Sequence, residues 1–235
     1  MRDFCLNIAA GLTSLAVVSQ ALAEEAYNPT INPADYSIKI DNPLFKFPVG
    51  KEMIYESKTE NGKSRIEIRV RGETRRIMGI ETLVYNDRVF HNGQLIEETQ
   101  DYIAQDKEGN VWYFGEEVDN YEDGKLKDHQ GAWIAGVDGA KPGIWMKAKP
   151  VVGESYRQEY YKGEAEDWAK IVSIDETVKV SAGTFTNCTK IYEWTPLEPD
   201  AKAHKFYCAG AGGMTLEEEL LDGKRVELFK VIGGG

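Results

Sequence analysis

The sequence predicts a mainly β protein in which successive hairpins form one strongly curved antiparallel sheet, or a partly closed barrel, with little helix. Three observations predict this class. Asn-Gly or Asp-Gly pairs recur at 61–62, 92–93, 123–124 and 222–223; β-prone segments flank them; and helical periodicity is scarce. Such pairs adopt positive φ at both central positions of a type I′ hairpin turn.

The first residues have the pattern of a secretory signal peptide. Arg2 precedes an apolar run from Phe4 to Val18, and Ala21 and Ala23 form a small-x-small cleavage signal. We therefore expect cleavage near Ala23 and a periplasmic or extracellular location. The run is too short and too polar to span a membrane comfortably, and no later segment is apolar enough to do so. Cys5 does not stand at the end of the run, where a lipid-modified cysteine is expected.

Residues 24–50 are expected to form an extended lead-in that contains several prolines. Its last part, "DNPLFKFPVG", is expected to hold aromatic side chains against the edge of the domain. Residues 51–232 are then expected to form a single antiparallel β domain. Within it, "KSRIEIRVR" alternates apolar and charged side chains, which is typical of a sheet with one solvated face. "NVWYF" is apolar on both faces and is expected to lie centrally or under a cover.

Five further segments carry specific expectations. "DKEGN" at 106–110 predicts a longer hairpin loop with Gly109 in the left-handed conformation, and the Gly- and Pro-bearing segment 136–150 predicts a loop. Residues 163–170 are the best candidate for a single helical turn. "GAGG" at 210–213 is interpreted as a strand bend, and "EEE" at 217–219 as a charge run that protects an edge strand from pairing with other chains.

The formal net charge of −11 limits the partners of the chain. A chain this acidic repels nucleic acid and anionic lipid surfaces, so we expect no nucleic-acid partner. The charge is compatible with cations and basic partners, although it identifies neither.

Cys188 and Cys208 are the two cysteines that follow the signal peptide. They flank "TPLEPDAK", the predicted connection of a hairpin, and are symmetric about its position 198, so an antiparallel ladder would place them opposite each other. We expect a disulfide, because disulfides persist in exported proteins. In the chain-entropy model, a bridge closing a loop of this size contributes about 3 kcal/mol. The alternative is two free thiols, with Cys188 buried as a small apolar residue.

Several long phrases resemble a family of exported bacterial proteins without an assigned activity. They are "DNPLFKFPVG", "YIAQDKEGNVWYFGEEV", "GESYRQEYYKGEAEDWA", "AGTFTNC" and "EWTPLEP". The resemblance implies a secreted or cell-envelope β protein and assigns no catalytic or binding residue. In that family the Asn-Cys cysteine recurs, whereas a Pro-Gly turn stands near the position of "CAGAGG" here. Cys208 is therefore a departure that puts the disulfide in question. The architecture is also similar to the half-barrels of periplasmic lipid-carrier proteins, which says little about function.

The common catalytic and metal-binding motifs do not occur in this sequence. The three histidines show no HxH or HxxxH spacing, and there is no CxxC pair for zinc. G-x-S-x-G is missing, as are a phosphate-binding loop and a dinucleotide-binding fingerprint. We therefore predict that the protein is not an enzyme and that it needs no cofactor, with calcium as the one possibility left open.

Two clusters of carboxylates support the alternatives. In "GEEVDNYEDGK", Asp119, Glu122 and Asp123 could supply oxygen ligands for calcium, although the ordered spacing of an EF-hand is missing. The simpler interpretation is a solvated hairpin turn. In "KGEAEDWA", Glu164, Glu166 and Asp167 could supply a carboxylate pair for a hydrolase, although the rest of the chain offers no identifiable partner.

Aromatic residues form the remaining candidate site. Trp133 and Trp145 flank the Gly- and Pro-bearing segment, which a curved sheet would place near its rim, and Tyr156 and Tyr160 alternate on a nearby strand. Aromatic side chains over a concave sheet commonly line sites for apolar or carbohydrate ligands. The alternative is that these side chains belong to the core.

Together these patterns predict an exported, non-catalytic protein that binds a lipid, a glycan or another amphipathic small molecule. The first alternative is a structural or adhesive envelope component stabilised by calcium. The second is a carboxylate-based hydrolase.

Overall fold

The computed structural model of the chain describes residues 27–59 and 62–233. The predicted signal peptide at 1–23, including its cleavage site, and Asn61 of the first turn pair lie outside the described residues. The described residues form a protein that is nearly all β, as the sequence predicts. They include one short 3₁₀ helix, η1 (Pro33–Asp35), at which Asn32 is the N-cap.

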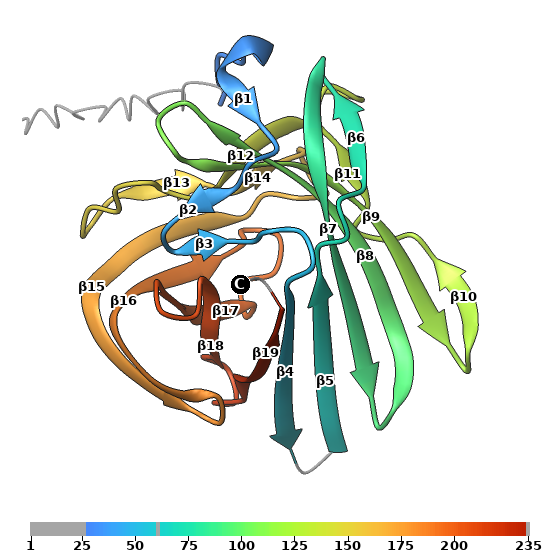
Figure 1. Cartoon of the computed structure of the whole chain (residues 1–235). Coiled ribbons are helices and arrows are strands. Elements are labelled where there is room, and N and C mark those ends of the chain that lie inside the picture. The colour runs from blue at the N-terminus through green and yellow to red at the C-terminus, as the bar shows by residue number, and fades with distance from the viewer. Residues whose placement is uncertain (1–26, 60–61, 234–235) are drawn as a thin grey trace, which may run out of the picture.

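The strands follow one another through the whole chain (Figure 1). They are β1 (Tyr36–Ser37), β2 (Asp41–Asn42), β3 (Phe45–Lys46), β4 (Glu52–Thr59), β5 (Gly62–Arg69), β6 (Thr74–Ile77), β7 (Ile80–His91), β8 (Gln94–Asp106), β9 (Val111–Glu122), β10 (Lys125–Asp128), β11 (Trp133–Ile134), β12 (Lys141–Met146), β13 (Ser155–Arg157), β14 (Glu159–Tyr160), β15 (Trp168–Val180), β16 (Gly183–Trp194), β17 (Lys202–Cys208), β18 (Gly213–Glu219) and β19 (Arg225–Ile232).

The main sheet is antiparallel and nearly closed like a barrel. Its pairings run in the order β13, β15, β16, β17, β18, β19, β4, β5, β7, β8, β9, β12, β14. The chain therefore starts the domain in the middle of the sheet, at β4, and runs outwards through β5, β7, β8 and β9 to β12. It then resumes at the opposite end of the sheet and returns through β15 to β19, which pairs with β4. Figure 1 shows the two arms, β5 to β10 on one side and β15 to β19 on the other, curving around a common interior.

Segment 155–160 connects the two ends of this sheet. Its first half, β13, pairs with β15, and its second half, β14, pairs with β12. At the second contact the backbones of β12 and β14 are very close, because a Cβ atom built on Gly143 would lie 2.3 Å from the carbonyl carbon of Gln158. The side chain of any other residue at 143 would push the two strands apart, so this glycine permits the closure.

The predicted two-residue reversals are confirmed at two sites. Asn92 and Gly93 have φ of 49° and 83° between β7 and β8, and Asp123 and Gly124 have φ of 52° and 72° between β9 and β10. The β4–β5 hairpin also pairs Thr59 with Gly62, as expected. Positive φ at both residues of a two-residue loop matches the twist of the flanking strands and pins their register.

The turn predicted at 222–223 differs from expectation. Of this pair, Gly223 alone has a positive φ, 72°, and the connection from β18 to β19 spans residues 220–224. The amide of Gly223 donates to the carbonyl of Glu219 at 3.0 Å, which closes a longer loop. An Asp-Gly pair therefore provides the left-handed glycine here without forming a type I′ turn.

Five other expectations need comment. Gly109 has φ of 89° in the β8–β9 loop, as predicted. The expected loop at 136–150 contains β12, and the expected helical turn at 163–170 is instead a turn that leads into β15. "GAGG" forms the reversal between β17 and β18 and not a bend within a strand. "EEE" lies on β18, which is paired on both sides and so is not an edge strand.

The β15–β16 hairpin is long, and its far end curves past the other strands of the barrel (Figure 1). At its tip, the amide of Ala182 donates to the carbonyl of Leu228 on β19 at 3.0 Å. Val178 of the hairpin is buried, as are Phe206 on β17 and Leu216 on β18, whose side chains point away from the interior. The hairpin thus forms a second apolar layer over the outer face of β17 to β19.

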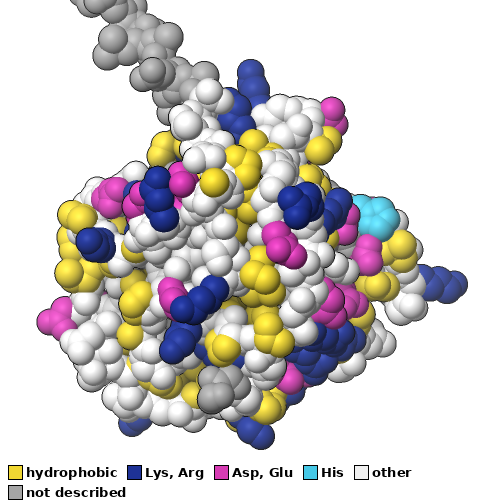
Figure 2. Space-filling view, turned by 45° about the horizontal axis from the view of Figure 1, so that its top comes forward, with side chains coloured by type: hydrophobic (Ala, Val, Ile, Leu, Met, Phe, Trp, Pro, Cys, Tyr) yellow, Lys and Arg dark blue, Asp and Glu magenta, His cyan; other side chains and the backbone are white. Residues whose placement is uncertain are grey.

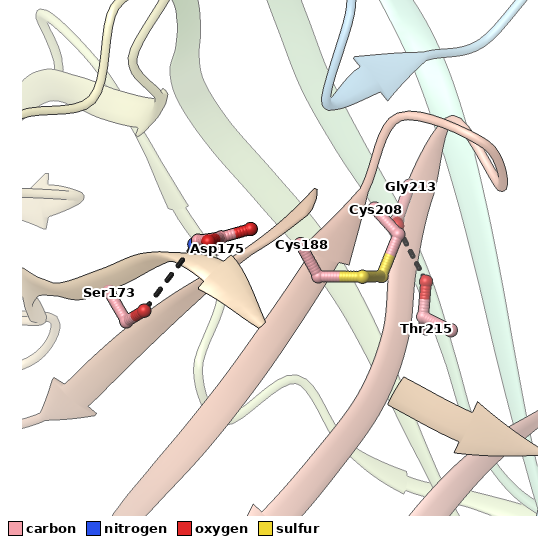
Figure 3. Close-up of a disulfide and its surroundings, with 6 residues drawn as sticks. All are labelled: Ser173, Asp175, Cys188, Cys208, Gly213 and Thr215. Atoms are coloured by element: carbon pink, nitrogen blue, oxygen red, sulfur yellow. Dashed lines mark hydrogen bonds between the residues drawn. A yellow bond between two sulfur atoms is a disulfide. The ribbon is translucent and has the colours of Figure 1, made fainter. Parts of the chain in front are cut away.

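The predicted disulfide between Cys188 and Cys208 is present. The two residues are direct partners in the β16–β17 ladder, with Cα atoms 4.2 Å apart. Figure 3 shows the bridge crossing between these strands, close to the reversal that follows Cys208. Both cysteines are fully buried, and the link joins the end of β17 to the middle of β16, where the pairing between these two strands begins.

The lead-in closes one end of the barrel with aromatic side chains. The β2–β3 hairpin is anchored on both sides: Asn42 donates to the carbonyl of Gly109 at 2.9 Å, and the amide of Lys46 donates to the carbonyl of Gly212 at 3.0 Å. Between these anchors, Phe45 and Phe47 are each 1% exposed. The expectation that "DNPLFKFPVG" holds aromatics against the domain is confirmed, and they lie in its interior. Among the described residues, no helix has the length and apolar character to cross a membrane.

Candidate functional site: an acidic cavity inside the barrel

Strand register determines which charged side chains face the barrel interior. Lys205 is the direct partner of Ile191 on one side and of Glu217 on the other, and Asp101 is the partner of Glu116. Directly paired residues project from the same face of a sheet. Because Ile191 is fully buried on the inner face, Lys205 and Glu217 also point inwards, and several of the charges on this acidic chain lie inside the barrel.

These inward charges line a cavity of about 190 Å³. Its walls come from β9, β12, β16, β17 and the segment 155–167, so the site is assembled where segment 155–160 closes the sheet. The lining residues are Tyr113, Glu116, Trp145, Gln158, Glu159, Asp167, Glu193 and Lys205. We call this space the inner cavity.

Among the described residues that line the inner cavity, Lys205 is the one cation, and it is paired with Glu193. Its Nζ lies 2.7 Å from Glu193 Oε2, and the Nε2 of Gln158 donates to Glu193 Oε1 at 3.0 Å. Burial acts to lower the pKa of Lys205, but Glu193 and Glu217 outweigh it and hold that pKa well above its usual value. Lys205 is therefore charged at neutral pH, and both oxygens of Glu193 have partners.

Glu159 and Asp101 each accept one hydrogen bond from an aromatic side chain. The Nε1 of Trp133 donates to Glu159 Oε2 at 2.9 Å, and the hydroxyl of Tyr113 donates to Asp101 Oδ1 at 2.6 Å. Burial nevertheless raises the pKa of both carboxyl groups well above the usual values, and neighbouring carboxylates add to the effect. These bonds are too few to compensate for the removal of water.

Glu116 and Asp87 show the same effect. Burial raises the pKa of each to about 7, and Glu97 contributes in both cases. The pKa of Asp167 is also raised, with burial as the main cause. Asp87 Oδ1 is buried without a hydrogen-bond partner among the described residues. Buried carboxyls with raised pKa values, in and around a cavity, mark this region as a candidate functional site.

A larger cavity of about 460 Å³ adjoins the first. The two share Asp167, Glu193 and Lys205 as a common wall. The remaining lining comes from the ends of β16, β17 and β18 and from the loop at 195–201. These residues are Trp194, Thr195, Glu198, Asp200, Ala201, Lys202, Ala203, Glu217, Glu219 and Leu221. We call this space the outer cavity.

The four aromatic residues singled out in the sequence lie in different environments. Trp145 lines the inner cavity, and Trp133 is 3% exposed behind Glu159. Tyr156 is 7% exposed, with a hydroxyl that has no partner among the described residues. Tyr160 lies outside this group and packs against Tyr27 with ring centroids 5.7 Å apart. The aromatics therefore support the interior of the barrel and do not form an exposed rim.

The structure does not bring the predicted calcium ligands together. Asp119 lies 2.9 Å from His129 Nδ1, Glu122 lies 3.8 Å from Lys127, and Asp123 occupies the turn. Across residues 27–59 and 62–233, no three His, Cys, Asp or Glu side chains form a group that could hold a metal ion. Calcium binding remains an untested prediction without support from this geometry.

The predicted hydrolase residues are also separated. Glu164 is exposed, and Glu166 accepts the amide of Gly163 at 2.8 Å and lies 3.6 Å from Arg157. Of the three, Asp167 alone reaches the inner cavity.

Sequence reasoning missed Glu116, Glu159, Glu193 and Lys205. A signal was present in "HKFYC". Strand residues at i and i+2 project from the same face, so Lys205 lies on the same face as the aromatic residue Tyr207. Gln158 and Tyr156 are related in the same way. Strand alternation alone does not say which face of the sheet is the inner one.

Comparison with known proteins adds little about activity. No family model and no curated protein matches the chain. Among solved structures, the chain is similar to a protein described as a putative lipoprotein from Parabacteroides distasonis, with a TM-score of 0.45 and 11% sequence identity. That likeness covers 80% of this chain and 98% of the other. It assigns neither a ligand nor a reaction.

Proposed function

We propose that this protein is a non-catalytic binding protein of the cell envelope that holds a small polar or amphipathic molecule in the inner cavity. The observation that carries the proposal is the convergence of Glu116, Glu159, Asp167 and Lys205 on a space bordered by aromatic side chains. The envelope location rests on the signal-peptide pattern of the sequence and on the disulfide, which is typical of exported proteins.

The energetic cost of this interior supports a functional role. Removing a carboxyl or ammonium group from water costs several kcal/mol unless paired charges and hydrogen bonds compensate. Here burial raises the pKa of Glu116 to about 7 and that of Glu159 well above its usual range. A barrel filled with apolar side chains would avoid this cost. An interior that retains unpaired carboxyls is better explained by a ligand that compensates them.

Size and polarity favour a small ligand with a polar group over a long acyl chain. The inner cavity of about 190 Å³ is smaller than the usual range of drug-sized pockets. The apolar end of the barrel is already occupied by Phe45, Phe47 and Tyr85, whose ring centroids lie 4.9 to 5.7 Å apart. An apolar part of the ligand could contact Trp145, while its polar part meets the carboxyls.

Tryptophan fluorescence provides a direct test. We expect a small polar or amphipathic compound to change the emission of the wild-type protein and to raise its melting temperature. Trp145→Phe should lose the emission change. Trp112→Phe should keep it, because the Nε1 of Trp112 donates to Asp106, at 2.7 Å, and its side chain does not line the inner cavity. The proposal fails if no compound in a broad set acts, or if the response persists unchanged in Trp145→Phe.

A further inference from the structure

We propose that the ligand of the inner cavity is a linear aliphatic polyamine. One ammonium group would lie among Glu116, Glu159 and Asp167, and the rest of the chain would extend into the outer cavity. This inference rests on the proposed binding function and adds the chemical class of the ligand.

The balance of charge in the inner cavity is the first argument. Four carboxyl groups and one ammonium group line it. Lys205 and Gln158 already occupy both oxygens of Glu193, at 2.7 and 3.0 Å. No further cation from residues 27–59 or 62–233 lines the cavity to pair with Glu116, Glu159 and Asp167. A ligand with an ammonium group supplies the missing charge, whereas an anionic ligand would be repelled.

Glu159 provides an independent argument for a hydrogen-bond donor. Its side chain lines the cavity although the residue is only 8% exposed. Trp133 donates to its Oε2, but no described residue donates to its Oε1. Because Glu159 lines the cavity, a carboxylate oxygen that no protein group donates to can accept a hydrogen bond from a ligand there. An ammonium group carries three N–H donors, so it can satisfy this oxygen and reach a second carboxylate at the same time.

The aromatic wall suits a cation as well. Tyr113 and Trp145 border the cavity, with ring centroids 4.7 Å apart and planes inclined by 58°. The hydroxyl of Tyr113 donates a hydrogen bond to Asp101, and Phe45 packs against Trp145 at a centroid distance of 5.3 Å. The rings are therefore fixed before any ligand arrives. Cations are attracted to such ring faces, more strongly where water is excluded.

The outer cavity explains why the ligand should carry more than one charge. Beyond the shared wall it adds Glu198, Asp200, Glu217 and Glu219, with Lys202 as the one further cation in the part of the chain that the structure describes. Glu219 is occupied by Lys224, which lies outside the cavity lining, at 2.6 Å. The acidic lining thus continues from the inner cavity to the surface. A chain of methylenes that separates ammonium groups can follow it, whereas a compact cation reaches one end only.

Isothermal titration calorimetry with spermidine, putrescine, butylamine, glucose and oleate tests the inference. We expect spermidine to bind more tightly than putrescine, and putrescine more tightly than butylamine, with about tenfold between successive members. Glucose and oleate should not bind. Added salt should weaken spermidine binding less than it weakens binding at an exposed surface, because buried pairs are less screened.

Glu159→Gln is the decisive variant, since its side-chain amide oxygen can still accept the Trp133 N–H and so preserve the fold. It should lower spermidine affinity at least tenfold, while Glu164→Gln, at an exposed position, should leave it unchanged. Near-ultraviolet circular dichroism checks that both variants are folded. Should Glu159→Gln be misfolded, Glu116→Gln carries the same expectation.

Each contrary outcome has a distinct meaning. Glucose or oleate acting through Trp145 while the amines do not bind would overturn the polyamine class and leave the binding function standing. No binding by any compound would overturn both. Spermidine binding that is equal in Glu159→Gln, Glu164→Gln and the wild type would place it on the acidic surface, and the inference would be wrong.

Discussion

Replacing Glu116 with glutamine should stabilise the protein at pH 8. Burial, opposed by the Tyr113 hydroxyl and reinforced by Glu97 and Asp167, raises the pKa of this carboxyl from 4.5 to about 7. Each tenfold change in an ionisation equilibrium corresponds to about 1.4 kcal/mol of difference between the two protonation states. Ionising Glu116 in the folded protein therefore costs about 3 kcal/mol. Glutamine resembles the protonated carboxyl in shape and avoids this cost.

The sign of the pH dependence follows from proton binding. Between about pH 4.5 and 7 the folded state holds a proton on Glu116 that the unfolded state has released. The stability contributed by this group is present below about pH 4.5 and is lost as the pH rises to about 7. Asp87, whose pKa is also raised to about 7 by burial, acts in the same direction. The curve of Glu116→Gln should therefore be shallower than that of the wild type, but not flat.

Urea unfolding at pH 4.5, 5, 6, 7 and 8 measures both effects. We expect the free energy of unfolding of Glu116→Gln to exceed that of the wild type by up to about 3 kcal/mol at pH 8, with little difference at pH 4.5 and below. Glu164→Gln is the matched control, because its side chain is exposed, and should follow the wild-type curve. If Glu116→Gln is no more stable than the wild type at pH 8, or keeps the wild-type slope, Glu116 is not a buried, destabilised carboxyl and the reasoning fails.

Three further predictions concern the framework of the site. Reducing the Cys188–Cys208 disulfide should lower the stability by about 3 kcal/mol, and an unchanged melting temperature under reductant would contradict this. Gly143→Ala should cost about 3 kcal/mol or more because its Cβ would overlap the backbone of β14. The matched control is Gly210→Ala, whose Cβ would lie 3.4 Å from the nearest side-chain atom and which should leave the melting temperature nearly unchanged. If both variants lose the same stability, the close approach at Gly143 is not specifically required for closing the barrel. Lys205→Met should destabilise by about 3–5 kcal/mol in urea because it leaves Glu193 buried without its cation, whereas a stable variant would show that the pair is dispensable.

Local turn chemistry explains why the sequence predicts the architecture well. Asn92-Gly93 and Asp123-Gly124 form their reversals because the required backbone conformation is intrinsic to these residue pairs. The position of Cys188 opposite Cys208 follows from the symmetry of one hairpin. Such features depend on residues close in sequence, so they can be predicted without knowledge of the rest of the fold.

The closure of the barrel depends on contacts that are distant in sequence and is harder to predict. Pro142 and Gly143 suggest a loop, yet both lie in β12, where Gly143 allows β14 to approach. Proline and glycine normally weaken a strand. Here the close approach of β14 leaves no room for a side chain at position 143. Nothing near that position in the sequence indicates that β14 is the partner.

The candidate site was missed because it depends on which face of each strand is buried. Glu116 and Glu117 are neighbours, yet Glu116 faces the interior and Glu117 faces solvent. A register irregularity between Asp101 and Ile103, opposite Gly115, shifts the pairing of β9 at this point. One extra residue in a strand reverses the side to which every following side chain points. Simple alternation therefore cannot locate the inward carboxyls.

The face of the molecule shown in Figure 2 gives no comparable indication of a ligand site. In the view of Figure 2, acidic and basic side chains are interspersed, and hydrophobic side chains are scattered between them. Scattered exposed apolar residues are ordinary on a folded protein and need no functional explanation. The unusual feature of this acidic chain is the set of carboxyls inside the barrel.

A crystal structure of the protein grown with spermidine would test the central claim most directly. The account predicts an amine nitrogen within hydrogen-bond distance of Glu159 and of Glu116 or Asp167, with the carbon chain leading into the outer cavity. An inner cavity filled by rearranged side chains, or spermidine bound only on the outer surface of the barrel, would contradict it.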